Sequence, residues 1–322
     1  MLPYYNMKTE NISKKILILG GPTGVGKSDI SFDLSLALNG EIISADSMQF
    51  YKEINIGTGK TPKWMRDKVP HHLIDFLSLR EDFDVKAFVE SALLCVEEIL
   101  SRGKVPIIVG GSGLYIRSLL TGIFPMPEGS SERKNEIREN LASKELSELY
   151  SQLQLVDPTS ASRINKNDRK RISRALEIYY LTGKTITFWH KQKSEDRLAN
   201  IGVTLYFILT RSREVMYNRI ERRVDEMFEE GWIKEVVRLK DEGLQGPLLY
   251  KAPIGYAEII DYLDSKYSME ELVNLVKKKT KTYARKQLTW FRREDGIWLE
   301  IQDKRKTVEE IIKNFLALKT ED

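Results

Sequence analysis

The segment GGPTGVGKS, residues 20–28, constrains the fold of this chain more than any other feature. It follows the apolar run KILILG, precedes a stretch with helical periodicity, and fits the pattern G-x-x-x-x-G-K-[ST]. In that strand–loop–helix setting, glycines let consecutive N–H groups turn inward and Lys27 adds a positive charge, so the loop binds phosphate groups. The predicted phosphate-binding residues are Gly21, Pro22, Thr23, Gly24, Val25, Gly26, Lys27 and Ser28.

Short apolar runs alternate with helical patterns along most of the chain. The runs at 15–20, 41–47, 105–111 and 203–210 predict strands, and the helix predicted from Ser28 to Leu38 ends at an Asn-Gly pair. Continuous apolar strands that alternate with helices are typical of a buried parallel sheet. The sequence therefore predicts an α/β fold of the P-loop NTPase-like kind, with a parallel sheet flanked by helices.

Residues 125–200 differ from the rest, because they show helical spacing and no strand-like run. We predict an all-helical domain at 125–200, inserted into a catalytic core formed by 1–124 and 201–322. The apolar positions that should form the core of this domain are Ile137, Leu141, Leu146, Leu149, Ile172, Leu176 and Ile178.

Composition excludes several classes of protein. The longest apolar stretches fall short of the ~20 residues that span a bilayer, and the N-terminus lacks the form of a signal peptide. The single cysteine, Cys95, excludes a disulfide framework and fits a reducing cytoplasm; its apolar helical setting indicates a small core residue and not a nucleophile. Adjacent His71 and His72 cannot face the same metal in a regular element, and with a distant His190 and no cysteine partners the sequence argues against a zinc site.

Positive charge is concentrated, although the formal net charge is only +4. One cluster comprises Arg163, Lys166, Arg169, Lys170, Arg171 and Arg174. A second helix, which opens with the capping box Ser268–Glu271, places Lys277, Lys281 and Arg285 on one stripe. A basic stripe is often plain solvated surface, but two in one chain favour a polyanionic partner, with each stripe facing phosphates.

Asp46 is the acidic residue that follows a predicted strand at the sheet edge where a P-loop ligand lies. The later strands end in Gly110-Gly111 and Thr210-Arg211, without the carboxylate that a nucleoside-triphosphate hydrolase or kinase needs for its magnesium ion. Asp46 can be a metal ligand, a base, or an N-cap of a following helix. The Thr23 hydroxyl can reach the bridging oxygen of a diphosphate ester.

Eight strings, in this order, carry a family resemblance: GPTGVGKS, SADSMQFYKEINIGTGK, PHHLID, VGGSGLY, NDRKRISRALEIYYLTGK, RIERRVDEMFEEG, IGYAE and RKQLTWFRR. From the loop to Arg293 the chain resembles the tRNA dimethylallyltransferases, also called tRNA isopentenyltransferases. The resemblance implies transfer of a prenyl group from dimethylallyl diphosphate to N6 of the adenine 3′ of the anticodon, in tRNAs that read codons beginning with U. The P-loop would then hold the diphosphate of the donor.

The resemblance also assigns residue roles. It implies that Asp46 is the general base, that Thr23 contacts the bridging oxygen and that Ser28 binds Mg²⁺. Arg223 matches the arginine that clamps the diphosphate. The implied tRNA-binding residues are Asp46, Ser47, Met48, Gln49, Ser112, Lys134, Lys170, Arg171, Ile172, Ser173 and Arg174. The family usually has threonine where this chain has Ser112, and Arg133 beside Lys134 is an alternative for that contact.

Other functions share parts of this pattern. Prenylation of free adenine nucleotides, as in the cytokinin-forming relatives, would use the same loop but would not need the basic helical insertion. A small-molecule P-loop kinase should show ATP turnover, and a non-catalytic RNA-binding module gives no reason for Lys27, Ser28 and Asp46. We expect a cytoplasmic monomer, because one active site engages an asymmetric RNA.

Overall fold

The chain divides into two compact units. The computed structural model describes residues 14–123, 130–192 and 197–319. Residues 1–120 and 197–322 make up one unit, here called the core unit, and residues 121–196 make up the other, the helical unit. Two segments on which predictions were made lie outside the described residues: the N-terminus, which lacks the form of a signal peptide, and the start of the predicted helical domain at 125–129.

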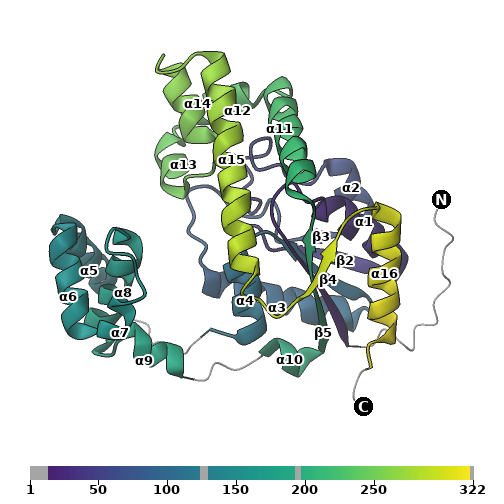
Figure 1. Ribbon diagram of the computed structural model, residues 1–322, viewed down its shortest axis with the longest axis horizontal. Helices are drawn as coiled ribbons and strands as arrows, with labels where there is room; N and C mark the ends of the chain where they lie inside the picture. The colour runs from purple at the N-terminus through teal and green to yellow at the C-terminus, as the bar shows by residue number, and fades with distance from the viewer. Residues whose placement is uncertain (1–13, 124–129, 193–196, 320–322) are drawn as a thin grey trace. The chain divides into compact units, whose positions relative to one another are not determined.

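The core unit is built on a six-stranded parallel sheet in the order β3-β2-β4-β1-β5-β6 (Figure 1). Its strands are β1 (Lys15–Gly20), β2 (Gly40–Ser44), β3 (His71–His72), β4 (Val105–Gly110), β5 (Val203–Thr210) and β6 (Ile297–Glu300). The predicted α/β fold with a parallel sheet is confirmed. The four central strands coincide with the predicted apolar runs, and β1, β2 and β4 are buried along their whole length.

The two outer strands were not predicted. β3 consists of two histidines, and the apolar run of β6 is only three residues long and is mostly exposed, so neither resembles the longer buried strands. Both are strands because they pair with a neighbour: β3 with β2, and β6 with β5. Their existence depends on the rest of the sheet.

Helices cover both faces of the sheet. The core unit contains α1 (Lys27–Leu38), α2 (Lys63–Lys68), α3 (Val85–Ser101), α4 (Gly113–Thr121), α10 (Arg197–Ile201), α11 (Arg213–Glu229), α12 (Trp232–Asp241), α13 (Gln245–Lys251), α14 (Tyr256–Leu263), α15 (Met269–Phe291) and α16 (Lys304–Ala317). α1 and α16 share one hydrophobic cluster with alternate residues of β1, including Leu17 and Leu19. α3 packs on β2 and β4 and contributes no residue to that cluster, so it covers the other face.

A second hydrophobic cluster lies beside the sheet and joins α12, α13, α14 and α15. Trp232 and Tyr256 are fully buried in it, together with Ile54 and Leu79 from the loops that follow β2 and β3. α11 and α15 pack together through Met216, Ile220 and Ala284. The long helix α15 starts at the predicted capping box of Ser268 and Glu271.

The described residues of the helical unit form helices only: α5 (Ser131–Ser143), α6 (Leu146–Val156), α7 (Pro158–Ala161), α8 (Arg169–Thr182) and α9 (Ile186–Lys191). Its own core is made by α5, α6 and α8, with Ile137, Leu141, Leu149, Ile172 and Leu176 buried. This unit therefore has a hydrophobic centre that is separate from the sheet.

A buried carboxylate joins β2, β3 and the turn before β4. Glu41 is 3% exposed and contacts His72 at 2.7 Å, Arg102 at 2.7 Å and Lys104 at 2.8 Å. Burial alone would raise the pKa of Glu41, but the hydrogen bonds from Lys104, His72 and Arg102 outweigh it and lower that pKa to about 2.

We predict that Glu41→Gln lowers the free energy of unfolding at pH 7 by about 3 kcal/mol, because the native pKa of Glu41 lies below its unfolded value. This stabilisation is complete above the unfolded pKa and is lost as the pH falls towards 2.

The difference in free energy of unfolding between the wild type and the Glu41→Gln variant should therefore shrink by about 2 kcal/mol between pH 7 and pH 3. Urea unfolding at both pH values measures it. Glu309→Gln, which removes an exposed pair with Arg305, is the control and should cost less than about 0.5 kcal/mol. A deficit that does not change with pH would contradict the prediction.

Candidate active site

The phosphate-binding loop and Asp46 meet at the carboxyl edge of the sheet. β1 leads into the loop and α1, and β2 leads to Asp46. β4 lies between β1 and β2 and pairs with both. The chain after β2 stays close to β4, because Ala45 donates its N–H to the Val109 carbonyl at 2.8 Å. The order of the strands thus brings together two segments that are about twenty residues apart in sequence.

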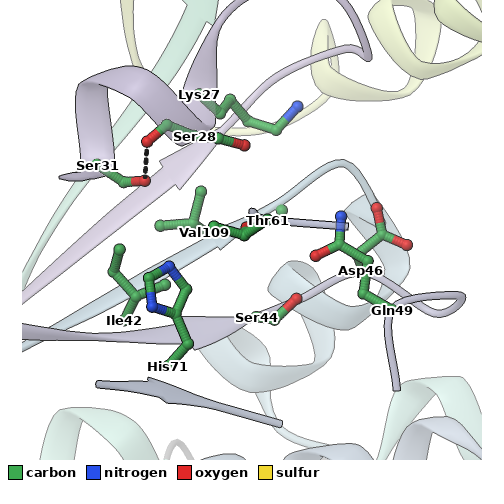
Figure 2. Close-up of a pocket in the computed structure, with 11 residues that line it drawn as sticks. Lys27, Ser28, Ser31, Ile42, Ser44, Asp46, Gln49, Thr61, His71 and Val109 are labelled. Carbon is green, nitrogen blue, oxygen red and sulfur yellow. Dashed lines mark hydrogen bonds between the residues drawn. The ribbon is translucent and has the colours of Figure 1, made fainter. Parts of the chain in front are cut away.

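A small cavity of about 50 Å³ lies between these segments. Figure 2 shows Lys27 and Ser28, from the start of α1, across this cavity from Asp46 and Gln49. Two apolar residues, Ile42 and Val109, and the imidazole of His71 also line the cavity. The full lining comprises Lys27, Ser28, Ser31, Ile42, Ser44, Asp46, Gln49, Thr61, His71, Val109 and Gly110.

The Lys27 side chain lies against the phosphate-binding loop, where the sequence predicts its positive charge. Its Nζ donates to the carbonyls of Gly21 at 2.7 Å and Pro22 at 2.8 Å. Burial lowers the pKa of Lys27 to about 8; Asp46 opposes this shift and Arg223 adds to it. Near neutral pH the lysine is a cation whose charge is poorly solvated, which favours an incoming anion.

Two arginines that were not predicted hold the loop from behind. Arg211 donates to the Val25 carbonyl at 2.9 Å, and Arg219 on α11 donates to the Gly24 carbonyl at 3.0 Å. Gly26 has φ +100°, a value that favours glycine, and it leads directly into the N-terminus of α1. Because the loop carbonyls are bound on one side, the N–H groups at the start of α1 remain oriented for an anion.

Asp46 is not an N-cap, so that interpretation is wrong. Residues 47–50 form turns rather than a helix, and an Asp46 carboxylate oxygen accepts the N–H of Met48 at 3.0 Å. This bond inside a turn orients the side chain towards the cavity (Figure 2). The N–H of Ser47 donates to the Ser112 hydroxyl at 3.3 Å, so these two predicted tRNA-binding residues also lie together.

Arg223 lies beside the same site, half-buried on α11. It donates to the Gly59 carbonyl at 2.9 Å. Burial lowers the pKa of Arg223, whereas the charge of Asp46 raises it. Gly59 has φ +54°, and a Cβ at this position would lie 1.4 Å from an Arg223 nitrogen, so only glycine permits the contact.

The loop before Gly59 is anchored by a carboxylate that sequence reasoning missed. Glu235 on α12 accepts the N–H groups of Asn55 at 2.9 Å and Ile56 at 3.0 Å, and the Tyr256 hydroxyl at 2.7 Å. Two helices later in the chain, α12 and α14, therefore help to determine where Arg223 is held. No periodic signal in the sequence marks Glu235 as different from other helix-surface acids.

The remaining predicted tRNA-binding residues lie in the helical unit. Lys170, Arg171 and Arg174 are exposed on α8, Ser173 is half-buried there, and Lys134 is half-buried on α5. Ile172 is 0% exposed, so its side chain belongs to the core of this unit and is not available to RNA. The helical period turns this side chain inward, so a contact of Ile172 with RNA would have to use its backbone.

Two lysines of the predicted basic stripe of α15 form ion pairs within the protein. Lys277 contacts Asp225 at 2.6 Å, and Lys281 contacts Glu221, both on α11. The periodicity placed these lysines correctly on one face, but that face borders the carboxylates of a neighbouring helix. Arg285, the third member, is exposed.

Other expectations can be compared with the structure. Cys95 on α3 is half-buried rather than part of the buried core, and burial raises its thiol pKa to about 11, which disfavours the thiolate form. Among the described residues, no cluster of three or more His, Cys, Asp or Glu could hold a metal ion. Within the same residues, no helix is both long and apolar enough to cross a membrane.

The cavity nevertheless suits a hard divalent cation that is bound together with phosphate. The Ser28 hydroxyl and the Asp46 carboxylate both line it, and both are oxygen donors of the kind that Mg²⁺ uses. Mg²⁺ usually takes few ligands from the protein and the rest from substrate phosphates and water. These donors therefore fit a metal ion that is bound jointly by the protein and by substrate phosphates. They do not fit an ion whose ligands all come from the protein.

Known proteins of similar sequence point to one family. The family model described as IPP transferase matches residues 49–294, and that of Isopentenyl transferase matches residues 14–79. A tRNA dimethylallyltransferase of Thermotoga neapolitana is 42% identical over 94% of this chain and 99% of that protein. The enzyme of the same name from Anoxybacillus flavithermus is 40% identical over 91% of this chain and 92% of its own length.

Solved structures are similar over nearly the whole chain. The full-length tRNA isopentenylpyrophosphate transferase of Bacillus halodurans is 37% identical, with a TM-score of 0.68 over 94% of this chain and 97% of that one. A eukaryotic dimethylallyltransferase whose crystal structures were described as snapshots of the enzyme acting on tRNA is 29% identical, with a TM-score of 0.78 over 94% of this chain and 80% of that one. With the P-loop, Asp46 and Arg223 gathered at one sheet edge, these similarities show that the chain belongs to the IPP transferase family.

Proposed function

We propose that this protein transfers a dimethylallyl group from dimethylallyl diphosphate to N6 of the adenine 3′ of the anticodon, in tRNAs that read codons beginning with U. The observation that carries the proposal is the cavity in which Lys27 and Ser28 of the phosphate-binding loop face Asp46. A phosphate site opposite a carboxylate fits a reaction in which diphosphate leaves as a proton is removed from a nucleophile. Relatives that match nearly the full chain are named for this transfer to tRNA.

The phosphate-binding loop stabilises the diphosphate leaving group. The carbon–oxygen bond of the donor breaks, and both electrons go to the bridging oxygen of the diphosphate. Lys27 and the N–H groups at the start of α1 neutralise this charge, Thr23 donates to the bridging oxygen, and Arg223 clamps the outer phosphate. A Mg²⁺ ion held by Ser28 and the diphosphate would supply further neutralisation.

Asp46 acts on the nucleophile. The lone pair of an exocyclic adenine nitrogen is delocalised into the ring, so the nitrogen attacks weakly without help. Asp46 accepts a hydrogen bond from N6 and takes its proton as the carbon–nitrogen bond forms. The Met48 N–H that binds one carboxylate oxygen keeps the side chain aimed at the cavity.

The helical unit supplies positive charge for the RNA. Lys170, Arg171 and Arg174 are exposed on α8 and would bind the phosphate backbone. The target adenine must leave its stack in the anticodon loop, at a cost of a few kcal/mol that binding to the protein has to offset. This need for extra contacts explains why an enzyme acting on tRNA carries a basic unit that a mononucleotide substrate would not require.

Incubation with radiolabelled dimethylallyl diphosphate and Mg²⁺ tests the proposal. We expect label in tRNA whose anticodon is followed by adenine, and none in the same tRNA with guanine at that position. Label in AMP but not in tRNA would favour the cytokinin-type reaction. Turnover of ATP without prenyl transfer would favour a kinase.

Asp46→Asn should lower kcat for tRNA prenylation by about a hundredfold or more, because asparagine cannot take the proton. Asparagine can still accept the Met48 N–H, so the turn and the melting temperature should change little. Steady-state kinetics and thermal unfolding measure both effects. Asp67→Asn, on an exposed pair with Lys63, is the control and should retain full activity. Unchanged kcat in the Asp46 variant would remove the base from this mechanism.

The Lys27 pKa predicts an alkaline limit for donor capture. Because the free-enzyme pKa is about 8, Lys27 loses its charge as the pH rises through that value. The ratio kcat/KM for dimethylallyl diphosphate should therefore fall above pH ~8, by about tenfold per pH unit, since this ratio reports the free enzyme. Lys27→Arg should have a lower rate but no such alkaline limb, because arginine stays charged. A wild-type profile that is flat to pH 9.5 would contradict the assignment.

The double variant Lys170→Gln with Arg171→Gln should weaken tRNA binding about tenfold at low salt and reduce the slope of log K against log salt by about two. KM for dimethylallyl diphosphate should not change. Fluorescence anisotropy of labelled tRNA across a salt series measures the binding. Arg305→Gln with Lys306→Gln, which removes the same two charges from exposed positions of α16, is the matched control. Equal losses in both double variants would show that only net charge matters.

A further inference from the structure

Gln287 connects the helix α15 to two loops of the candidate active site. Its side-chain oxygen accepts the N–H of Thr23 at 2.9 Å, and its side-chain nitrogen donates to the Gly111 carbonyl at 2.9 Å. The residue is 7% exposed. Both partners are backbone groups of fixed polarity, so only one orientation of the amide satisfies both bonds.

The two loops that Gln287 joins serve opposite sides of the cavity. Thr23 lies in the phosphate-binding loop, and Gly111 directly follows β4. The next residue, Ser112, binds the segment that contains Asp46, since its N–H donates to the Ala45 carbonyl at 3.4 Å and its hydroxyl accepts the Ser47 N–H at 3.3 Å. One buried amide thus links the leaving-group side to the base side.

Local packing leaves no room for another arrangement. A Cβ at Gly111 would lie 2.4 Å from the Gln287 side-chain nitrogen, so this close approach needs glycine. Because the Thr23 N–H is bound by Gln287, it is not one of the N–H groups that face an anion. The bond from Gln287 restrains the backbone at Thr23, and with it the direction in which the Thr23 side chain leaves the loop.

We propose that Gln287 is a positioning residue for the transfer reaction: it holds the Thr23 hydroxyl at the bridging oxygen and sets the spacing between the phosphate-binding loop and the Asp46 segment. The inference rests on the proposed function, because it needs a diphosphate ester in the loop. Gln287 itself touches neither substrate, since it is buried and both of its polar atoms are bound to the backbone. Its effect therefore passes through the groups that it binds, which are the Thr23 N–H, the Gly111 carbonyl next to Ser112, and the Tyr283 hydroxyl.

The first test replaces Gln287 with methionine, which has similar length and makes no such hydrogen bonds. We expect kcat to fall about tenfold or more, because Thr23 is no longer fixed where charge develops on the leaving oxygen. The dissociation constant for tRNA should change less than about twofold. Val276→Ala is the matched control: it lies on the same helix and is fully buried, so it should cost about 1 to 2 kcal/mol of stability. This control should retain kcat at 25 °C, where both variants remain folded by circular dichroism.

A double-mutant cycle with Thr23→Ala separates positioning from general stability. If Gln287 acts through Thr23, the Gln287→Met change should cost much less kcat in the Thr23→Ala background than in the wild type. Equal losses in the two backgrounds would overturn the inference, as would a Gln287→Met enzyme with wild-type kcat. A kcat loss in Val276→Ala as large as that in Gln287→Met would also overturn it, because destabilisation alone would then explain the effect. A wild-type protein that prenylates no RNA would overturn the proposed function, and this inference with it.

Discussion

The parallel pairing of β1, β4 and β2 is the interaction on which the site depends. Because parallel strands end at the same edge, this pairing brings the phosphate-binding loop, Gly111 and Asp46 to one place. The three strands are buried along their length, so their spacing is set by a close-packed core rather than by exposed loops. The proposed reaction needs the leaving group and the base on opposite sides of a small cavity. The ends of these strands fix that arrangement.

Side chains that are distant in sequence then fix the positions of the loops that follow these strands. Arg211 and Arg219 bind carbonyls of the phosphate-binding loop, and Gln287 binds one of its N–H groups. On the other side, Glu235 holds the segment that leads to Gly59, the partner of Arg223. Each contact restrains backbone rather than substrate. Preorganised backbone is effective in catalysis because dipoles that are already oriented need not rearrange as charge develops.

The charge of Asp46 partly offsets the effect of burial on the two cations of the site, Lys27 and Arg223. Burial lowers the pKa of Lys27 and that of Arg223, and Asp46 counteracts the shift in both. A diphosphate would favour the charged form of both cations, so donor binding and cation charging support each other. The helical unit follows a simpler rule, with an apolar core of its own and exposed basic residues on α8, which suits a partner recognised mainly through its phosphates.

The amino-acid sequence by itself determined the phosphate-binding loop, the four central strands, the apolar core of the helical unit and the position of Asp46 at a strand end. Each of these is a local pattern, because periodicity and glycine spacing act over a few residues. Tertiary structure alone decided the short strand β3 and the exposed strand β6, which exist only through pairing with a neighbour. It also decided that Lys277 and Lys281 face carboxylates of α11, and that Gln287 reaches Thr23. Those outcomes depend on which helices pack together, and no short stretch of sequence contains that information.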